Sequence, residues 1–222
     1  MPANKRTYAQ FCGIARALDV VGERWTLLIV RDLFLGPRRF KDLMTGLPGI
    51  TTNLLAKRLK DMAASGLIRR TRLPPPAGSM VYELTPRGAD LKDVLMALGR
   101  WGWPLMDAPG PEDRTDVGWA LVALHRRFTG TVGAWTLEIR AEDSVHQVRA
   151  KDGDLTVRSG TYWEPDLVLL GTLPSVAALF HRGVPLERLE AQGLRLEGSP
   201  ELRAKVLQAF GISEGTDTAP EE

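Results

Sequence analysis

The segment over residues 47–68, LPGITTNLLAKRLKDMAASGLI, places one amide and two ammonium groups at helical spacing. On a wheel of about 100° per residue these polar side chains share one face, and the opposite face is apolar. An Asn amide can form two hydrogen bonds with the edge of an adenine, and a Lys ammonium pairs with phosphate. The alternative is that the polar face is only solvated. The polar residues are Asn53, Lys57 and Lys60, and the apolar ones are Leu55, Leu59 and Met62.

The residues before this helix favour a helix-turn-helix. RRFKDLMT predicts a short helix over 39–45, GLPGI predicts a Gly-containing turn, and Thr51 can cap the helix that follows. In such a motif the first residues of the second helix reach the base edges. Thr51, Thr52 and Asn53 therefore occupy the positions that would read sequence.

A hairpin is predicted directly afterwards, with strands over 66–73 and 80–85. PPPAGS must be its loop, because proline cannot donate ladder hydrogen bonds. Three arginines on the first strand can reach phosphates or the minor groove, which makes the hairpin a wing; alternatively they only keep an edge strand soluble. With two arginines that precede the short helix, the candidate nucleic-acid contacts are Arg38, Arg39, Thr51, Thr52, Asn53, Lys57, Lys60, Arg69, Arg70 and Arg72.

The rest of the chain divides at MDAPGPEDRTD, residues 106–116, which has linker composition. Before it we expect helices over 9–20, 23–34 and 86–105. After it we expect a helix over 116–128, strands over 134–140, 144–160 (a pair, with a turn at Asp152-Gly153) and 165–171, short helices over 174–181 and 186–191, a strand over 193–198, and a helix over 200–210. The predicted fold class is α+β. Its parts are a winged helix-turn-helix over 1–107, a linker over 108–115, an α+β unit over 116–213 and a disordered acidic tail over 214–222.

Charge is distributed unevenly along the 222 residues. Residues 1–110 hold 17 Lys and Arg against 9 Asp and Glu, a formal charge of +8, and residues 111–222 hold 12 against 18, or −6. A basic half joined to an acidic half indicates that the first half meets a polyanion. One cysteine and three scattered histidines exclude a disulfide framework and argue against a metal site, and no cofactor is expected. With no apolar leader or spanning segment, we expect a cytoplasmic protein without a membrane partner.

Residues 10–106 closely resemble the HxlR-type winged helix-turn-helix transcriptional regulators. The resemblance rests on Cys12, Gly22-Glu23-Arg24-Trp25, Arg39-Phe40, Asp42-Leu43, Leu59, Gly66-Leu67, Tyr82, Leu84, Thr85 and Gly88. It implies a homodimer, built from the first and last helices of the domain, that binds a near-palindromic double-stranded DNA operator. The PPPAGS loop departs from the pattern and indicates a stiff wing tip. Independently, an apolar stripe is too wide for so small a core and leaves room for a two-fold partner: Leu91, Val94, Leu95, Leu98, Trp101 and Leu105.

Cys12 is a candidate redox site, because the cysteine near the first helix senses oxidants or electrophiles in some proteins of the family that this chain resembles. Chemistry requires a thiolate, which Arg16 one turn away would favour. The alternative is packing, since Phe11, Ile14 and Leu18 indicate a buried seam in which a free cysteine behaves as a small hydrophobe.

The second half offers no catalytic constellation, and no enzyme is expected. Its acidic residues, Glu138 among them, are spread as on solvated faces. Residues 116–211 resemble sterol carrier protein type 2-like domains, most strongly from EPDLVLLG onwards, which implies an apolar tunnel for a small hydrophobic ligand. Its candidate lining is Trp119, Trp135, Trp163, Leu169, Val176, Leu179, Phe180, Leu186, Leu189, Leu207 and Phe210. The alternative is that these residues fill a solid core.

Three functions follow from these patterns. The first is a dimeric DNA-binding regulator, a repressor by expectation, whose second domain senses a small apolar molecule. The second is a lipid carrier or interaction module whose winged helix serves only dimerisation or partner binding. The third is a thiol-based regulator in which Cys12 is the switch.

Overall fold

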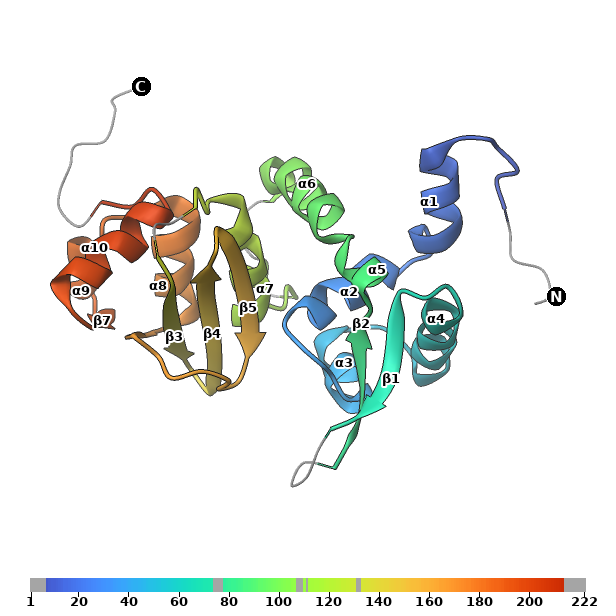
Figure 1. Cartoon of the computed structure of the whole chain (residues 1–222), viewed down its shortest axis with the longest axis horizontal. Helices are drawn as coiled ribbons and strands as arrows, with labels where there is room; N and C mark the ends of the chain where they lie inside the picture. Colours follow the sequence, from blue (N-terminus) through green and yellow to red (C-terminus); the bar gives the residue numbers. More distant parts are fainter. Residues whose placement is uncertain (1–6, 74–77, 107–109, 111, 131–132, 214–222) are drawn as a thin grey trace. The chain divides into compact units, whose positions relative to one another are not determined.

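The computed structural model describes residues 7–73, 78–106, 110, 112–130 and 133–213 (Figure 1). The chain forms two compact units, Met1–Ala97 and Leu98–Glu222. Most of the predicted wing-tip loop (74–77), part of the predicted linker and the predicted tail (214–222) lie outside the described residues. No helix in the described part is both long and apolar enough to cross a bilayer.

The first unit packs helices against a two-stranded hairpin. Its elements are α1 (Gly13–Val21), α2 (Thr26–Phe34), α3 (Phe40–Gly46), α4 (Thr52–Ala64), β1 (Ile68–Arg72), β2 (Met80–Leu84) and α5 (Pro86–Ala89), and α6 (Lys92–Gly102) begins in it. One apolar core holds α2, α3, α4 and the base of the hairpin together, with Ile29, Val30, Leu33, Leu43, Leu55, Leu59, Met62 and Ile68 buried in it. The helix-turn-helix and wing predicted from the sequence are confirmed.

Two glycines shape the connections around α4. Gly49 lies in the turn between α3 and α4 with a φ of 86°, and Gly66 follows α4 with a φ of 72°. An L-residue with a side chain rarely adopts these values. Beyond Gly66, the Leu67 N–H donates to the Met62 carbonyl at 3.0 Å, which closes the helix and directs the chain into β1.

The second unit is built on one five-stranded sheet of order β5-β4-β3-β6-β7, in which β3 and β6 are parallel and the other pairs antiparallel. The strands are β3 (Trp135–Ala141), β4 (Ser144–Lys151), β5 (Asp154–Ser159), β6 (Leu167–Gly171) and β7 (Arg195–Glu197). The helices are η1 (Trp103–Leu105), α7 (Val117–Val122), η2 (Ala123–Arg126), α8 (Leu173–Ala177), η3 (Ala178–Arg182), α9 (Leu186–Glu190) and α10 (Pro200–Ala209). The predicted turn at Asp152-Gly153 is confirmed, with both residues at positive φ between β4 and β5.

Several predicted helices differ from the observed ones. The helix predicted over 9–20 begins only at Gly13. The helix predicted over 86–105 is three pieces, α5, α6 and η1, and Pro104 accounts for the last break because it lacks the N–H that an α-helix would use there. The helix predicted over 116–128 ends as the 3₁₀ turn η2, and the one predicted over 174–181 passes from α8 into the π-helical η3.

Candidate nucleic-acid interface

Helix α4 is fixed at its start by a side-chain cap. Thr51 has extended backbone angles, and its Oγ1 accepts a hydrogen bond from the Leu54 N–H at 3.3 Å. Thr52 and Asn53 then form the exposed first turn. The cap therefore uses the Thr51 hydroxyl as an acceptor and leaves Thr52 and Asn53 as the leading polar side chains of the helix.

The two faces of α4 are as predicted. Leu55, Leu59 and Met62 are buried in the core of the first unit, at most 2% exposed. Asn53, Lys57 and Lys60 are exposed on the opposite face. The apolar contacts hold the helix by one side and leave the amide and both ammonium groups on its outer side.

Arg58 is a buried cation on α4 that the sequence pattern did not indicate. Its guanidinium forms an ion pair with Glu23 in the loop between α1 and α2, and Nη1 lies 3.6 Å from Asp61 Oδ2. A buried charge needs such partners, because its desolvation is costly. The position of Arg58 on the wheel, beside the apolar face, was the available signal.

The wing arginines lie on both faces of the hairpin. Side chains alternate along a strand, so Arg70 and Arg72 share one face of β1 and Arg69 lies on the other. Arg69 stands directly opposite Glu83 and pairs with it, with Nε 2.8 Å from Oε1. Arg72 Nε donates to the Gly78 carbonyl at 2.9 Å. The structure therefore does not bring the three arginines together as one cluster.

Arg38 and Arg39 lie between α2 and α3. The Arg38 backbone exchanges two hydrogen bonds with Tyr82 of β2, at 3.0 and 2.8 Å, and its Nε donates to the Asp32 carbonyl at 3.4 Å. Arg39 is exposed, and its N–H donates to the Asp42 carboxylate at 2.9 Å. The two bonds with Tyr82 join the segment before α3 to the wing.

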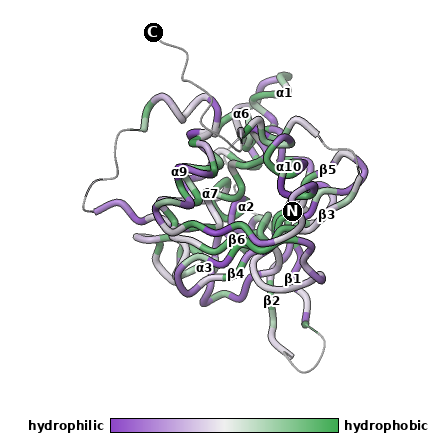
Figure 2. Tube along the Cα trace, turned by 90° about the vertical axis from the view of Figure 1, so that its left-hand side faces the viewer, coloured by the Kyte–Doolittle hydropathy of each residue, from purple (hydrophilic) through white to green (hydrophobic). Residues whose placement is uncertain are grey.

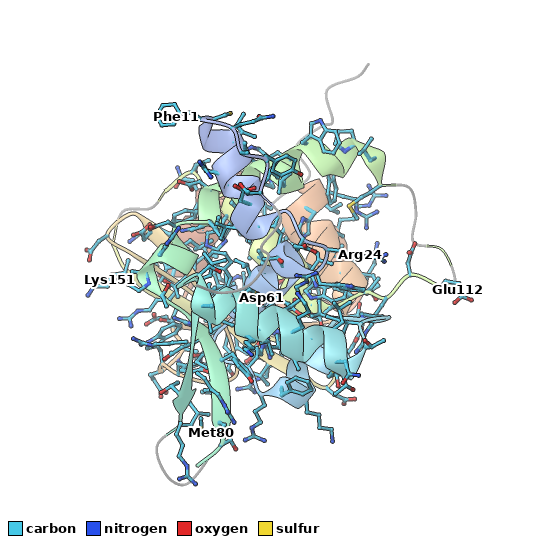
Figure 3. The ribbon with its side chains drawn as sticks, turned by 90° about the vertical axis from the view of Figure 1, so that its right-hand side faces the viewer. Phe11, Arg24, Asp61, Met80, Glu112 and Lys151 are labelled. Atoms are coloured by element: carbon cyan, nitrogen blue, oxygen red, sulfur yellow. The ribbon has the colours of Figure 1, made fainter. Side chains whose placement is uncertain are left out.

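Cys12 is exposed at the N-terminus of α1. The backbone N–H groups of Ala15 and Ile14 stabilise the thiolate and lower the pKa of Cys12 below its usual value. Phe11 and Ile14, which the sequence placed in a buried seam with Cys12, are exposed in the single chain; Figure 3 shows Phe11 pointing outward from α1. Arg16 pairs with Asp19 at 3.6 Å, so it is engaged elsewhere than at the thiol.

Most candidate ligand residues of the second unit lie together in its core. Leu169, Val176, Leu179, Phe180, Leu186, Leu189, Leu207, Phe210 and Trp135 are each at most 2% exposed. The rings of Phe180 and Trp135 meet that of Phe210 edge-on, at 5.1 and 6.1 Å between centroids. Trp119 is only half-buried.

Trp163 is separated from this core. Its ring lies under the Arg149 guanidinium at 5.2 Å, and its backbone N–H donates to Gln147 Oε1 at 2.9 Å. Gln147 and Arg149 alternate along β4 with Val148, which pairs with Leu137 on the core face. Trp163 therefore lies on the opposite face of the sheet from Trp135.

Glu138, which we expected on a solvated face, belongs instead to a buried polar pair on that second face of the sheet. Glu138 is 3% exposed and Gln147 is fully buried. Gln147 Nε2 donates to Glu138 Oε2 at 2.9 Å, and Arg140 Nη2 lies 2.7 Å from Glu138 Oε1. Gln147 also accepts from the Tyr162 N–H at 2.7 Å, so the pair anchors the segment that crosses this face. No group of three potential metal ligands occurs among the residues described.

A short helix, a Gly-containing turn, a second helix with an exposed polar N-terminal turn and a basic two-stranded hairpin define a winged helix-turn-helix, a class of nucleic-acid-binding domain. The HxlR-like helix-turn-helix family model matches residues 20–108. The chain belongs to this family.

Three relatives show the extent of the similarity. The chain is 35% identical over 91 residues to an uncharacterised HTH-type transcriptional regulator of Synechocystis sp., covering 41% of this chain and 67% of that protein. It is 40% identical over 99 residues to one of Mycobacterium tuberculosis, covering 44% and 62%. It is 34% identical over 85 residues to the regulator YodB of Bacillus subtilis, covering 38% and 76%. The reduced form of YodB has a TM-score of 0.39 and 29% identity, with 46% of this chain and 100% of that chain covered.

Proposed function

We propose that this chain is a dimeric, DNA-binding transcriptional regulator, with repression as the expected mode, whose second unit binds a small hydrophobic effector. The observation that carries the DNA-binding part is the two-sided α4. Its leucines are buried, and its first turn presents Thr52 and Asn53 beside exposed cations. Family membership supports the same assignment.

Within this proposal, each side chain has a distinct role. Thr52 and Asn53 lie at the end of α4 that enters a major groove and reads base edges. Lys57 and Lys60 on α4, Arg38 and Arg39 before α3, and Arg69, Arg70 and Arg72 on the wing contact phosphates, which positions the domain without reading sequence.

A homodimer is supported by apolar side chains left exposed on two helices. On α1 they are Ile14 and Leu18, with Phe11 just before the helix; on α6 and η1 they are Val94, Leu98, Trp101 and Leu105. Green, hydrophobic residues recur along both α1 and α6 in Figure 2. Exposed apolar surface of this kind marks interaction sites, and a two-fold partner would cover it.

The effector part of the proposal rests on the second unit. From β6 its elements follow the order predicted from the segment that resembles sterol carrier-like domains: a strand ending at Gly171, a short helix, a turn at Gly183, α9, β7 and α10. The aromatic residues around Phe210 would line the ligand site. An effector can change the free energy of DNA binding by at most the difference between its own binding free energies for the two arrangements of the wings.

Selection of preferred duplexes from a random pool, followed by binding titrations in increasing salt, tests the DNA assignment. Asn53→Ala should lower the discrimination between the preferred base pair and the other base pairs at one position by about 1–3 kcal/mol of binding free energy. Arg70→Ala is the matched control on the wing; it should weaken binding to all sequences and flatten the salt dependence by about one unit per subunit. If the Asn53→Ala protein selected the same preferred sequence as the wild type, the assignment of Asn53 as a base-contacting residue would be wrong.

A thiol-based regulator is the second candidate, favoured by the exposed Cys12 with its lowered pKa. In this form a mild oxidant or an electrophile modifies Cys12 and releases DNA. Cys12→Ser should then abolish release without weakening DNA binding in reducing buffer. Release that persists in Cys12→Ser would exclude this mechanism, because the chain has no other cysteine.

A further inference from the structure

Two of the candidate phosphate contacts are already bonded to carboxylates within the same domain. On the wing, Arg69 Nε lies 2.8 Å from Glu83 Oε1. On α4, Lys57 Nζ lies 3.0 Å from Asp61 Oδ2. Asp61 is labelled on α4 in Figure 3. Two of the cations assigned to DNA thus each lie beside a negative charge.

Regular secondary structure fixes both pairs. Arg69 and Glu83 are direct cross-strand partners in the antiparallel register, which brings their side chains together. Lys57 and Asp61 are four residues apart on one helix, the spacing at which side chains meet. Each carboxylate is also less exposed than its cation: the side chain of Glu83 is 24% exposed against 65% for Arg69, and that of Asp61 is 44% exposed against 64% for Lys57.

Asp61 is held from a second side. Its Oδ2 lies 3.6 Å from Nη1 of the buried Arg58, which is paired in turn with Glu23. A second cation besides Lys57 therefore favours this position of the Asp61 carboxylate. In contrast, Lys60 on the same helix and Arg70 on the same strand have no ion-pair partner among the residues that the structure describes.

A fixed carboxylate beside a cation changes how that cation meets DNA. Exposed ion pairs contribute only about 0–1 kcal/mol, so a polyanion can displace them. The carboxylate then remains near the phosphates and repels them. Since phosphate neutralisation governs both affinity and its salt dependence, each carboxylate should lower both.

We propose that Glu83 and Asp61 limit the affinity of the DNA interface. Each keeps one cation paired in the free protein and repels phosphates in the complex, so that the protein holds duplexes of any sequence less tightly than its count of arginines and lysines indicates. This inference rests on the proposed DNA-binding function. The predicted interface consisted of Lys and Arg side chains and the amide of Asn53. The inference adds two acidic residues that lower its affinity for DNA.

The test uses Glu83→Gln and Asp61→Asn in the full chain, with a fluorescent duplex of arbitrary sequence titrated at several KCl concentrations. Each variant should bind about fivefold more tightly at low salt, the equivalent of about 1 kcal/mol. The slope of log affinity against log salt should steepen by about one unit per subunit. Glu187→Gln on α9 is the control, because it removes the same charge from the second unit. It should change the affinity for the duplex by less than twofold and leave the salt slope unchanged.

The pairing itself is tested by combining substitutions. In an Arg69→Gln background, Glu83→Gln should give a smaller gain than in the wild type, because the cation that it releases is absent. Thermal unfolding of each variant checks that the domain remains folded, and the two carboxylates on separate elements provide independent tests.

The outcomes separate this inference from the function on which it rests. If the wild type binds duplex in a salt-dependent way but both carboxylate variants match Glu187→Gln, the affinity-limiting role is wrong and the DNA-binding function stands. If the wild type shows no binding to the arbitrary duplex or to selected sequences at low salt, both are overturned.

Discussion

Cys12 shows how position within an element sets the chemistry of one residue. As the residue preceding the first turn of α1, it faces the N–H groups that a helix leaves unpaired at its start. Those N–H groups favour the thiolate and lower the pKa of the Cys12 thiol. Arg16, which the sequence indicated as the activating cation, is instead bonded to Asp19. The backbone N–H groups at the start of α1, rather than a basic side chain, are therefore what lowers the pKa of the Cys12 thiol.

We predict that Cys12 reacts with iodoacetamide at neutral pH faster than the same cysteine in urea-unfolded protein. A lowered pKa means more thiolate at a given pH, so the pH profile of the folded protein should have its midpoint below that of the unfolded chain. Because the sequence has one cysteine, mass spectrometry of the intact protein reports this site alone. Coincident midpoints would contradict the role assigned to the helix N-terminus.

Helix α4 has a buried apolar face and an exposed polar face, and neighbouring residues of the helix lie on different faces. Leu59 is 2% exposed, and the next residue, Lys60, is exposed. Two neighbouring substitutions can therefore separate folding from binding.

Leu59→Ala should lower the free energy of unfolding by about 2–5 kcal/mol, because it leaves a cavity in the core. Lys60→Ala should change stability by less than about 0.5 kcal/mol, as expected for a surface position, while weakening DNA binding. Urea unfolding and duplex titration measure the two effects. A large loss of stability in Lys60→Ala would mean that this face serves packing.

The same elements show what the sequence could and could not predict. Apolar periodicity located α2, α3, α4 and the hairpin, because one face of each must be buried against the others. Helix ends were less accurate, since a break such as that at Pro104 comes from ring geometry that periodicity does not record. The strand over 66–73 was predicted, yet its arginines were treated as one group although alternation puts Arg69 on the other face.

Contacts between distant residues were beyond the reach of the sequence. The pairing of Arg58 with Glu23 joins positions 35 residues apart. The burial of Glu138 depends on Gln147, which becomes its neighbour only through the register of β3 and β4. A buried carboxylate on a strand resembles a solvated one until the opposing residue is known. In contrast, the exposure of Asn53, Lys57 and Lys60 on one face of α4 was predicted correctly, because spacing within one helix is sufficient to define that face.

For the whole molecule, the apolar residues exposed on α1 and α6 are the main feature that one chain leaves unexplained. Phe11 is fully exposed, and Trp101 is 73% exposed. Leu91 and Leu95 of the same stripe pack against the core of the first unit, so α6 has one side occupied and another uncovered. A second copy of the chain is the partner that we propose for this uncovered side.

Native mass spectrometry of the purified protein should therefore report a dimer, with added mass if a hydrophobic ligand is carried. Trp101→Glu should shift the population to monomer and weaken DNA binding, because two linked half-site contacts become one. Tyr162→Glu, which adds the same charge at an exposed aromatic residue of the second unit, should leave the dimer intact. A Trp101→Glu protein that remains fully dimeric would place the subunit contact elsewhere.

The backbone hydrogen bonds between Arg38 and Tyr82 constrain any signal that the protein receives. They join the middle of β2 to the segment that leads into α3, so a displacement of the wing must either break these bonds or move that segment with it. In the dimeric regulator that we propose, a signal that keeps these bonds therefore moves wing and helix-turn-helix together. The distance between the two DNA-binding domains is then the quantity that an effector or an oxidant would change.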